Sequence, residues 1–141
     1  MQSIIGSQYK NLIIKQINDA KTSIKIIMFD WRWYSDDPAN PVQLLNQSIV
    51  RAVRRGVDVR AVVNSDKIST ILKSVGIQAK KPTTSNLIHA KLVIIDDKII
   101  IVGSHNFSNM AFEHNYEAST LFDDAEIAKE YINFFNNLWQ L

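Results

Sequence analysis

The sequence has no cysteine and, among 141 residues, only four glycines and three prolines. Because there are no thiols, disulfides, thiolate metal sites and a cysteine nucleophile are excluded. Apolar runs such as residues 26–29 and 92–95 are far shorter than the roughly 18 residues of a bilayer-spanning helix. Residues 1–6 lack the basic region and long apolar run of a secretory leader. We therefore expect no stable membrane insertion, and a cytoplasmic location, or a periplasmic or secreted one if a leader has been removed.

The composition is that of an ordinary globular protein. Hydrophobic residues make up 46% of the chain and charged residues 21%, which excludes disordered and collagen-like classes. The length is typical of one compact domain, so we expect a single domain over residues 1–141. A net charge of +2 is only mildly basic and does not by itself indicate a polyanionic partner.

Helices and strands alternate in the first half of the chain. The predicted elements are helices over residues 7–20, 41–55 and 67–74 and strands over residues 23–29, 57–63 and 77–80. Asp66 is expected to cap the third helix, and Gly56 and Gly76 are expected to end the second and third. Such alternation indicates a parallel sheet with right-handed crossovers.

The second half has a different pattern. Two β-forming runs, residues 86–95 and 98–102, flank Asp96-Asp97 and predict an antiparallel hairpin. Residues 115–122 predict another strand, and two aspartates after it begin a final amphipathic helix. We therefore expect an α/β fold with a mixed sheet and helices on both of its faces.

Polar side chains are concentrated in the second half at strand-like spacing. His89 and Lys91 are two residues apart, so on a strand both side chains leave from the same face. Ser104 and Asn106 repeat this spacing after Gly103, whose missing side chain would let a substrate approach the backbone. An ammonium, a hydroxyl and an amide together suit the oxygens of a phosphate.

The same segment offers groups for catalysis. An imidazole attacks phosphorus in its neutral form and protonates a leaving oxygen in its charged form. Glu117 is the nearest carboxylate that could hold the second nitrogen of a histidine.

The spacing His89-x-Lys91, four residues, Asp96, six residues, Gly103-Ser104-x-Asn106 resembles the signature of the phospholipase D superfamily. Within that superfamily the chain is most similar to the small bacterial nucleases that carry one such motif. The resemblance extends over nearly the whole chain.

The resemblance implies a role for each motif residue. His89 would form a phosphohistidine, Lys91 and Asn106 would bind the phosphate oxygens with help from Ser104, and Glu117 would orient His89. Asp96 belongs to the motif and is carried over with it as a site residue, although its odd spacing from His89 favours a turn or hydrogen-bonding role. Gly103 would act sterically. The resemblance implies neither a metal nor another cofactor.

The resemblance also implies a dimer. The chemistry of the superfamily uses two histidines on opposite sides of one phosphorus, and this chain has one motif. A two-fold homodimer would bring His89 from each of two chains to a shared site. The two imidazoles would then titrate as a coupled pair.

Other residues support more than one interpretation. Trp31, Arg32 and Trp33 follow the first predicted strand, where ligands of α/β sheets bind, so they are candidate substrate-binding residues that stack on bases. Packing or a dimer contact is an equally good interpretation. His105 and His114 are expected to be loop or surface histidines, and a three-histidine zinc site is not expected.

Three functions remain open at this stage. The first is a metal-independent phosphodiesterase, specifically a nuclease without sequence preference acting on DNA or RNA, because the chain has no long loops to shape a lipid pocket. The second is a phospholipase or phosphatidyltransferase using the same site on phospholipids. The third is a nucleic-acid-binding module that has lost catalysis, against which the intact motif argues.

Overall fold

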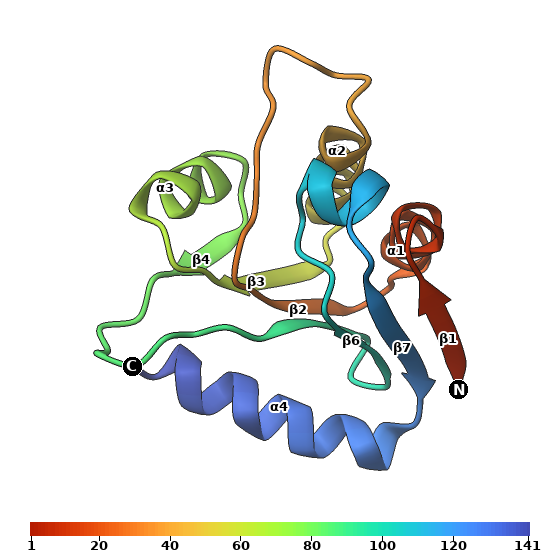
Figure 1. Cartoon of the computed structure of the whole chain (residues 1–141). Helices are drawn as coiled ribbons and strands as arrows, with labels where there is room; N and C mark the ends of the chain where they lie inside the picture. Colours follow the sequence, from red (N-terminus) through yellow and green to blue (C-terminus); the bar gives the residue numbers. More distant parts are fainter.

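A computed structural model describes residues 1–141 and shows one mixed sheet with helices on both faces (Figure 1). The strands are β1 (Gln2–Ile5), β2 (Ser23–Met28), β3 (Asp58–Val62), β4 (Gln78–Lys80), β5 (Lys91–Ile95), β6 (Ile99–Gly103) and β7 (Ala118–Asp123). The helices are α1 (Gln8–Asp19), α2 (Pro41–Arg54), α3 (Asp66–Ser74) and α4 (Ala125–Trp139), with a π-helical turn at Met110–His114. The strand order is β1-β7-β6-β5-β2-β3-β4. The α/β class with a mixed sheet is confirmed.

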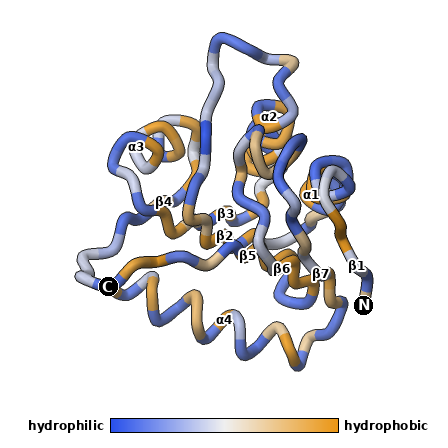
Figure 2. The backbone as a smooth tube through the Cα atoms, in the orientation of Figure 1, coloured by the Kyte–Doolittle hydropathy of each residue, from blue (hydrophilic) through white to orange (hydrophobic).

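The sheet separates two hydrophobic cores. Helices α1, α2 and α3 cover one face and α4 covers the other (Figure 1). The core beneath the three helices contains 28 buried residues and that beneath α4 contains 8, so the first face supplies most of the apolar burial. Figure 2 shows the apolar colour in the central strands and recurring along the helices, with hydrophilic loops around them.

The parallel half of the sheet forms as predicted. β2 pairs in parallel with β3, and β3 with β4. Gly56 and Gly76 follow the ends of α2 and α3 with φ of 91° and 89°, a conformation that favours glycine. The predicted cap of α3 is wrong by one residue, because Ser65 has the extended backbone and its Oγ accepts the Ile68 N–H.

The antiparallel half begins with the predicted hairpin. Asp96 and Asp97 both have φ of 54° and form its turn, closed by the Lys98 N–H donating to the Ile95 carbonyl at 3.1 Å. The first hairpin strand is shorter than predicted and begins at Lys91. Met28, the last residue of β2, lies opposite Lys91, so residues 86–90 have no neighbouring strand to pair with.

One strand was not predicted. β1 lies at the edge of the sheet and pairs antiparallel with β7. Its four residues are too few to show a convincing period in the sequence. No helix of the structure has both the length and the apolar character needed to cross a bilayer.

Candidate active site

All the motif residues except Asp96 lie at or near one end of the central strands, which we call the active-site edge of the sheet. β2, β3 and β6 end at this edge, whereas β5 and β7, which run antiparallel to β2 and β6, begin there. His89 and Lys91 therefore meet the residues that follow β6 and precede β7. Residues that are far apart in the sequence are brought together because antiparallel pairing places the end of one strand beside the start of the next.

His89 and Lys91 are in direct contact. The Nζ of Lys91 lies 2.9 Å from Nδ1 and 3.1 Å from Nε2 of His89. Both side chains also pack on Phe29, whose ring centroid lies 4.5 Å from that of the imidazole and 5.1 Å from the ammonium. This contact confirms that the two side chains leave on the same side, although His89 precedes the strand. His89 is exposed, so its ring is open to a ligand.

Lys91 carries its charge at the base of the site. Its residue is 9% exposed, and burial lowers the pKa of its ammonium while the negative charge of Glu117 opposes this shift. A partly desolvated cation attracts an anion more strongly than a fully hydrated one does.

Asn106 presents its amide nitrogen to the site. Its Oδ1 accepts the backbone N–H of Asp30 at 3.1 Å, which fixes the orientation of the amide. Nδ2 makes no hydrogen bond within the chain and remains free to donate to a phosphate oxygen. The backbones of residues 30–32 and Phe107 exchange two hydrogen bonds of 2.9 and 3.0 Å, so the segment after β2 holds the Asn106 loop in place.

Ser104 and Glu117 bind each other. The Ser104 hydroxyl donates to Glu117 Oε1 at 2.6 Å and also accepts the Ala118 N–H at 3.0 Å. The second oxygen of Glu117 accepts from Asn115 Nδ2 at 3.1 Å. Within one chain Glu117 has no hydrogen bond to His89, so the expectation that it orients His89 is not met inside the chain.

A residue outside the motif positions His89. Asn64 follows β3, and its Nδ2 donates to the carbonyl of Ile88 at 2.8 Å and to that of Phe29 at 3.2 Å. It therefore ties the residue before His89 to the end of β2. The only signal in the sequence was an asparagine at the end of a parallel strand, a position where ligand-binding residues of α/β sheets are common.

Two motif residues have structural roles. Asp96 lies at the opposite end of β5 from His89, and its carboxylate accepts the backbone N–H groups of Thr22, Ser23 and Lys21. Partial burial alone would raise the pKa of Asp96, but these hydrogen bonds together lower it below its usual value. Asp96 thus has the hydrogen-bonding role that its spacing favoured and makes no contact with the other motif residues.

Gly103 packs closely against β7. A Cβ at this position would lie 2.5 Å from the carbonyl oxygen of Ala118 and would also overlap Ser119. The missing side chain is needed because β7 passes this close to β6. The close contact between the strands thus explains the glycine, and the expected substrate contact stays a prediction.

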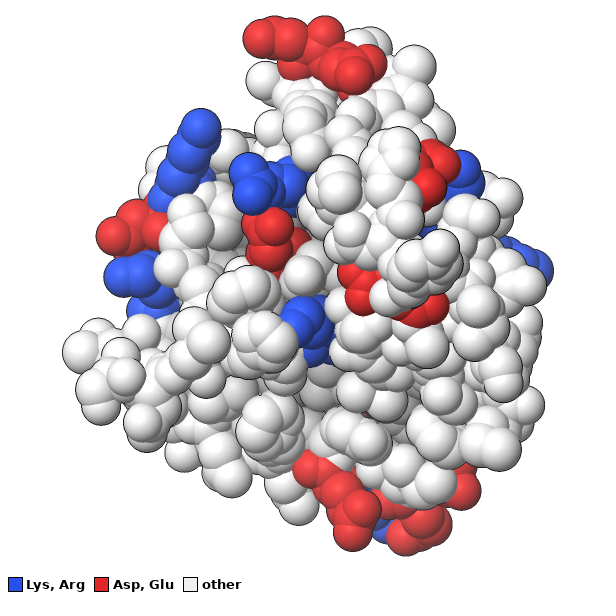
Figure 3. Space-filling view, viewed as in Figure 1, with Lys and Arg blue, Asp and Glu red and all other residues white.

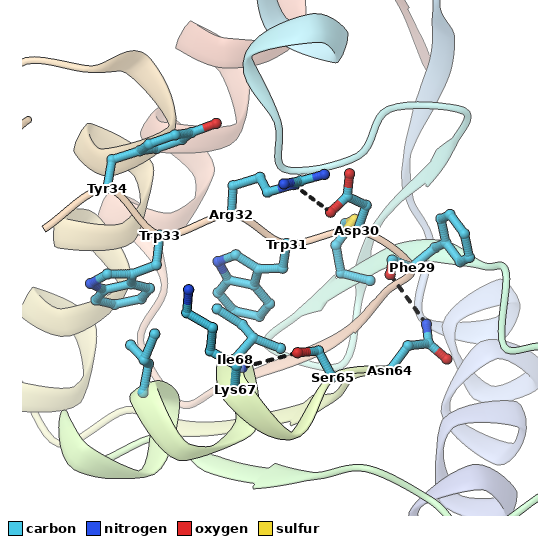
Figure 4. Close-up of a pocket in the computed structure, with 12 residues that line it drawn as sticks. Phe29, Asp30, Trp31, Arg32, Trp33, Tyr34, Asn64, Ser65, Lys67 and Ile68 are labelled. Carbon is cyan, nitrogen blue, oxygen red and sulfur yellow. Dashed lines mark hydrogen bonds and ion pairs between the residues drawn. The ribbon is translucent and has the colours of Figure 1, made fainter.

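The segment after β2 is divided between core and surface. Trp31 is 5% exposed, packs edge-on against Phe107 and donates its indole N–H to Asn46 at 2.8 Å, so most of its side chain belongs to the core. Arg32 is exposed and paired with Asp30 at 2.8 Å. Trp33 is half-buried and lines a cavity of about 300 Å³ between this segment and α3 (Figure 4).

The other histidines lie outside the site. His105 is buried, contrary to expectation: it stacks on Tyr9 at 4.3 Å, and its ring nitrogens bond the Ser119 hydroxyl at 2.7 Å and the Gly6 carbonyl at 2.8 Å. His114 is exposed at the end of the π-helical turn, as expected. No three His, Asp or Glu side chains are close enough together to hold a metal ion.

The fold and the site define a class of protein, namely an α/β domain with a histidine, a lysine and an asparagine at the strand ends of a mixed sheet. The family model described as cardiolipin synthase, PLD-like domain, matches residues 13–139. The chain therefore belongs to this family and to the phospholipase D superfamily.

Individual relatives agree with this assignment. A mitochondrial cardiolipin hydrolase of Mus musculus is 26% identical over 134 residues, which cover 91% of this chain and 57% of that protein. A phospholipase D of Rickettsia prowazekii is 30% identical over 131 residues, which cover 88% of this chain and 60% of that protein. The chain thus spans somewhat more than half the length of these curated relatives.

A solved structure shows the same fold. Nuc, a phospholipase D family member from Salmonella typhimurium, superposes with a TM-score of 0.82 at 22% identity. The alignment covers 99% of this chain and 94% of that one. At this identity the likeness shows the fold alone.

Proposed function

We propose that the chain is a phosphodiesterase that hydrolyses nucleic acid strands, with His89 as its nucleophile. The observation that carries the proposal is the convergence of three groups on one exposed site. His89 offers an open imidazole, Lys91 an ammonium in contact with it, and Asn106 a free amide nitrogen held in a fixed orientation. This set provides a nucleophile together with two donors for non-bridging phosphate oxygens.

The reaction proceeds in two displacements. In the first, a neutral His89 nitrogen forms a bond to phosphorus while the bond to one ester oxygen breaks, and a second, protonated imidazole gives its proton to that oxygen. In the second displacement, the imidazole that gave up its proton is neutral and takes a proton from water. The water oxygen bonds to phosphorus as the bond between phosphorus and His89 breaks. The products are a phosphate monoester and an alcohol, and both imidazoles return to their starting forms.

The second imidazole is supplied by another copy of the chain. His105 is buried and both of its ring nitrogens are bonded, so it has no access to substrate. A two-fold homodimer brings the His89 side chains of two chains to one phosphorus. Exposed apolar side chains near the site support such a contact: Leu87, Met110 and Tyr116 are 69%, 56% and fully exposed, and each lies within four residues of a motif residue or Glu117.

The shape of the surrounding surface favours a polymer. Hollows of about 300 and 350 Å³ lie on the two sides of residues 30–34, and one of about 330 Å³ lies before His89. Each is at the small end of ligand pockets, and together they border the site without forming one deep chamber. Several small hollows can accommodate successive nucleotides of a strand, whereas two long acyl chains would need one deep chamber.

Phospholipid hydrolysis is the second candidate, and one observation favours it. The exposed Leu87, Met110 and Tyr116 would also suit contact with a lipid surface. The names of the Mus musculus and Rickettsia prowazekii relatives point in the same direction. In the proposed nuclease the second chain covers these side chains, whereas in a phospholipase they would contact the lipid surface.

A direct comparison of substrates tests the proposal. Purified protein is assayed on DNA, RNA, phosphatidylcholine vesicles and cardiolipin vesicles, each with and without excess EDTA. We expect cleavage of DNA or RNA that persists in EDTA, with little lipid hydrolysis. Hydrolysis of lipid alone would replace the nuclease with the second candidate, and loss of nucleic acid cleavage on chelation would refute the metal-free mechanism.

Chain mixing tests the shared site. When wild-type protein is allowed to exchange subunits with an equal amount of His89→Asn, only dimers of two wild-type chains have both imidazoles, about a quarter of the total under random pairing. The activity per wild-type chain should therefore fall to about half. Activity that stays proportional to wild-type chains would show that each chain works alone.

A further inference from the structure

The cavity beside residues 29–34 is the strongest feature that the catalytic groups do not explain. It has a volume of about 300 Å³ and lies between this segment and α3 (Figure 4). Trp31 and Ile68, both buried, belong to its lining, together with the half-buried Trp33. In the view of Figure 4 the side chain of Lys67 rises from α3 between the indoles of Trp31 and Trp33. An open hollow thus combines aromatic rings with a cation.

The cavity shares two lining residues with the surroundings of His89. Phe29 and Asn64 line it, and the same two residues hold the nucleophile: the Phe29 ring packs on His89, and Asn64 bonds the carbonyl of Ile88. Trp33 follows Phe29 by four residues, so their Cα atoms are at most about 14 Å apart. A ligand that fills the cavity therefore lies next to the group bound at His89.

The wall of the cavity is also fixed relative to the loop that carries Asn106. Arg32 donates its backbone N–H to Phe107, and Phe107 donates to Asp30. Trp31 packs on Phe107 in the core. The indole of Trp33 and the amide of Asn106 are consequently carried by two segments that are bonded to each other, which gives a ligand spanning both a constant geometry.

The chemistry of the lining matches a nucleobase. Aromatic side chains stack on bases of any sequence, and neighbouring cations neutralise the phosphates that connect them. Lys67 is exposed and has no ion pair, and Arg32 is exposed at the same cavity. On the face shown in Figure 3 several basic side chains lie over the α3 side. A volume of about 300 Å³ is small for a ligand pocket and accommodates a planar ring.

We propose that this cavity binds one unpaired nucleobase of the strand whose phosphodiester is held at His89, so that the protein prefers single-stranded to duplex substrate. The proposal rests on the proposed nuclease function. A base enters such a cavity only when it is out of its stack, and a duplex must first be opened at an energetic cost. A single strand does not bear that cost of unpairing.

The test uses variants that remove the stacking ring or the cation. Trp33→Leu keeps an apolar side chain against the core, and Lys67→Ala alters an exposed residue. The matched controls are Trp139→Leu on α4 and Lys73→Ala at the other end of α3, neither of which lines the cavity. Two substrates are compared: oligothymidylate and an abasic sugar-phosphate oligomer of the same length, which has no ring to stack.

We expect Trp33→Leu and Lys67→Ala to lower kcat/KM on oligothymidylate by about tenfold. Trp33→Leu should cleave the abasic oligomer at the wild-type rate, because that oligomer has no base to stack. Wild-type protein should cleave single-stranded DNA faster than the same sequence in a duplex. Unchanged cleavage of oligothymidylate by both variants, or an equal loss by Trp33→Leu on oligothymidylate and the abasic oligomer, would overturn the base site. If wild-type protein cleaves no nucleic acid, the proposed function itself fails, which is a different result.

Discussion

The ammonium of Lys91 lies within 3.1 Å of both ring nitrogens of His89. An ammonium has only donors, so it can hold the ring only through a nitrogen that carries no proton. The neutral imidazole is also the form that attacks phosphorus. In the proposed reaction, a phosphate oxygen that accepts a hydrogen bond from Lys91 would replace this contact and leave the ring nitrogen free to attack.

Replacing His89 should separate catalysis from binding. His89→Asn removes the nucleophile but keeps a polar side chain, so kcat should fall on the order of 10⁴-fold or more. Binding of an oligonucleotide, measured by fluorescence anisotropy, should change little because Lys91 and Asn106 remain. His114→Asn, an exposed histidine on the π-helical turn, is the matched control and should keep full activity. Substantial turnover by His89→Asn would remove His89 from the nucleophile role.

The two ends of the Asn106 amide can be tested separately. Its oxygen accepts the Asp30 N–H, whereas its nitrogen has no hydrogen-bond partner within the chain. Asn106→Asp keeps the oxygen acceptor and loses the donor, so the variant should retain its melting temperature while kcat/KM falls roughly 10²- to 10³-fold. Asn106→Ala loses both functions and should lower the melting temperature as well. Equal losses of stability in the two variants would contradict this division of roles.

The contact between His89 and Lys91 could be predicted because it rests on local geometry. The spacing of His89 and Lys91 puts their side chains on the same side of an extended segment, and the structure brings them into contact. The parallel and antiparallel halves of the sheet could also be predicted, since periodicity and turn residues depend on neighbouring positions. Asp96 was correctly separated from the histidine by its odd spacing.

Residues whose roles depend on distant partners could not be predicted. Asn64 bonds residues 35 positions before it and 24 positions after it. His105 and Trp31 are polar or amphipathic side chains that become buried because the Gly6 carbonyl, Ser119 and Asn46 supply their hydrogen-bond partners. Gly103 is required by the approach of β7. In each case the partner belongs to an element whose position is set only by the complete sheet.

The hairpin turn offers a comparison of two adjacent aspartates. Asp96 and Asp97 share φ of 54°, where glycine is favoured, so replacement by glycine relieves the same backbone strain at both. Asp96→Gly also strips acceptors from three backbone N–H groups and should cost about 1–3 kcal/mol of unfolding free energy. Asp97→Gly loses one exposed ion pair with Lys25 and should change stability by less than about 1 kcal/mol.

Urea unfolding of the two glycine variants provides the measurement, and activity provides a second. Because Asp96 lies at the far end of β5 from His89, folded Asp96→Gly should keep nearly wild-type kcat. A large loss of kcat in fully folded protein would show that Asp96 acts in the reaction. Equal stability of the two variants would show that its backbone hydrogen bonds contribute little.

His105 should make the fold sensitive to acid. Burial lowers the pKa of this imidazole, opposed by its hydrogen bond to the Gly6 carbonyl and by the charge of Glu117. The neutral ring with its proton on Nε2 donates to Gly6 and accepts from Ser119, so the folded state favours the uncharged form. In the unfolded chain the pKa returns to about 6.5. The unfolded state therefore binds more protons, and stability falls as the pH drops below about 6.5 toward the folded pKa.

The slope can be assigned to this residue by comparing three proteins. Urea unfolding from pH 8 to 5 should show stability decreasing more steeply for wild-type protein than for His105→Gln, which cannot be protonated. His105→Gln should be less stable than wild type at pH 8, by about 1–3 kcal/mol, because the stack on Tyr9 and one hydrogen bond are lost. His114→Gln is the control, since an exposed imidazole should leave the wild-type slope intact. If His105→Gln retains that slope, other groups cause the acid sensitivity.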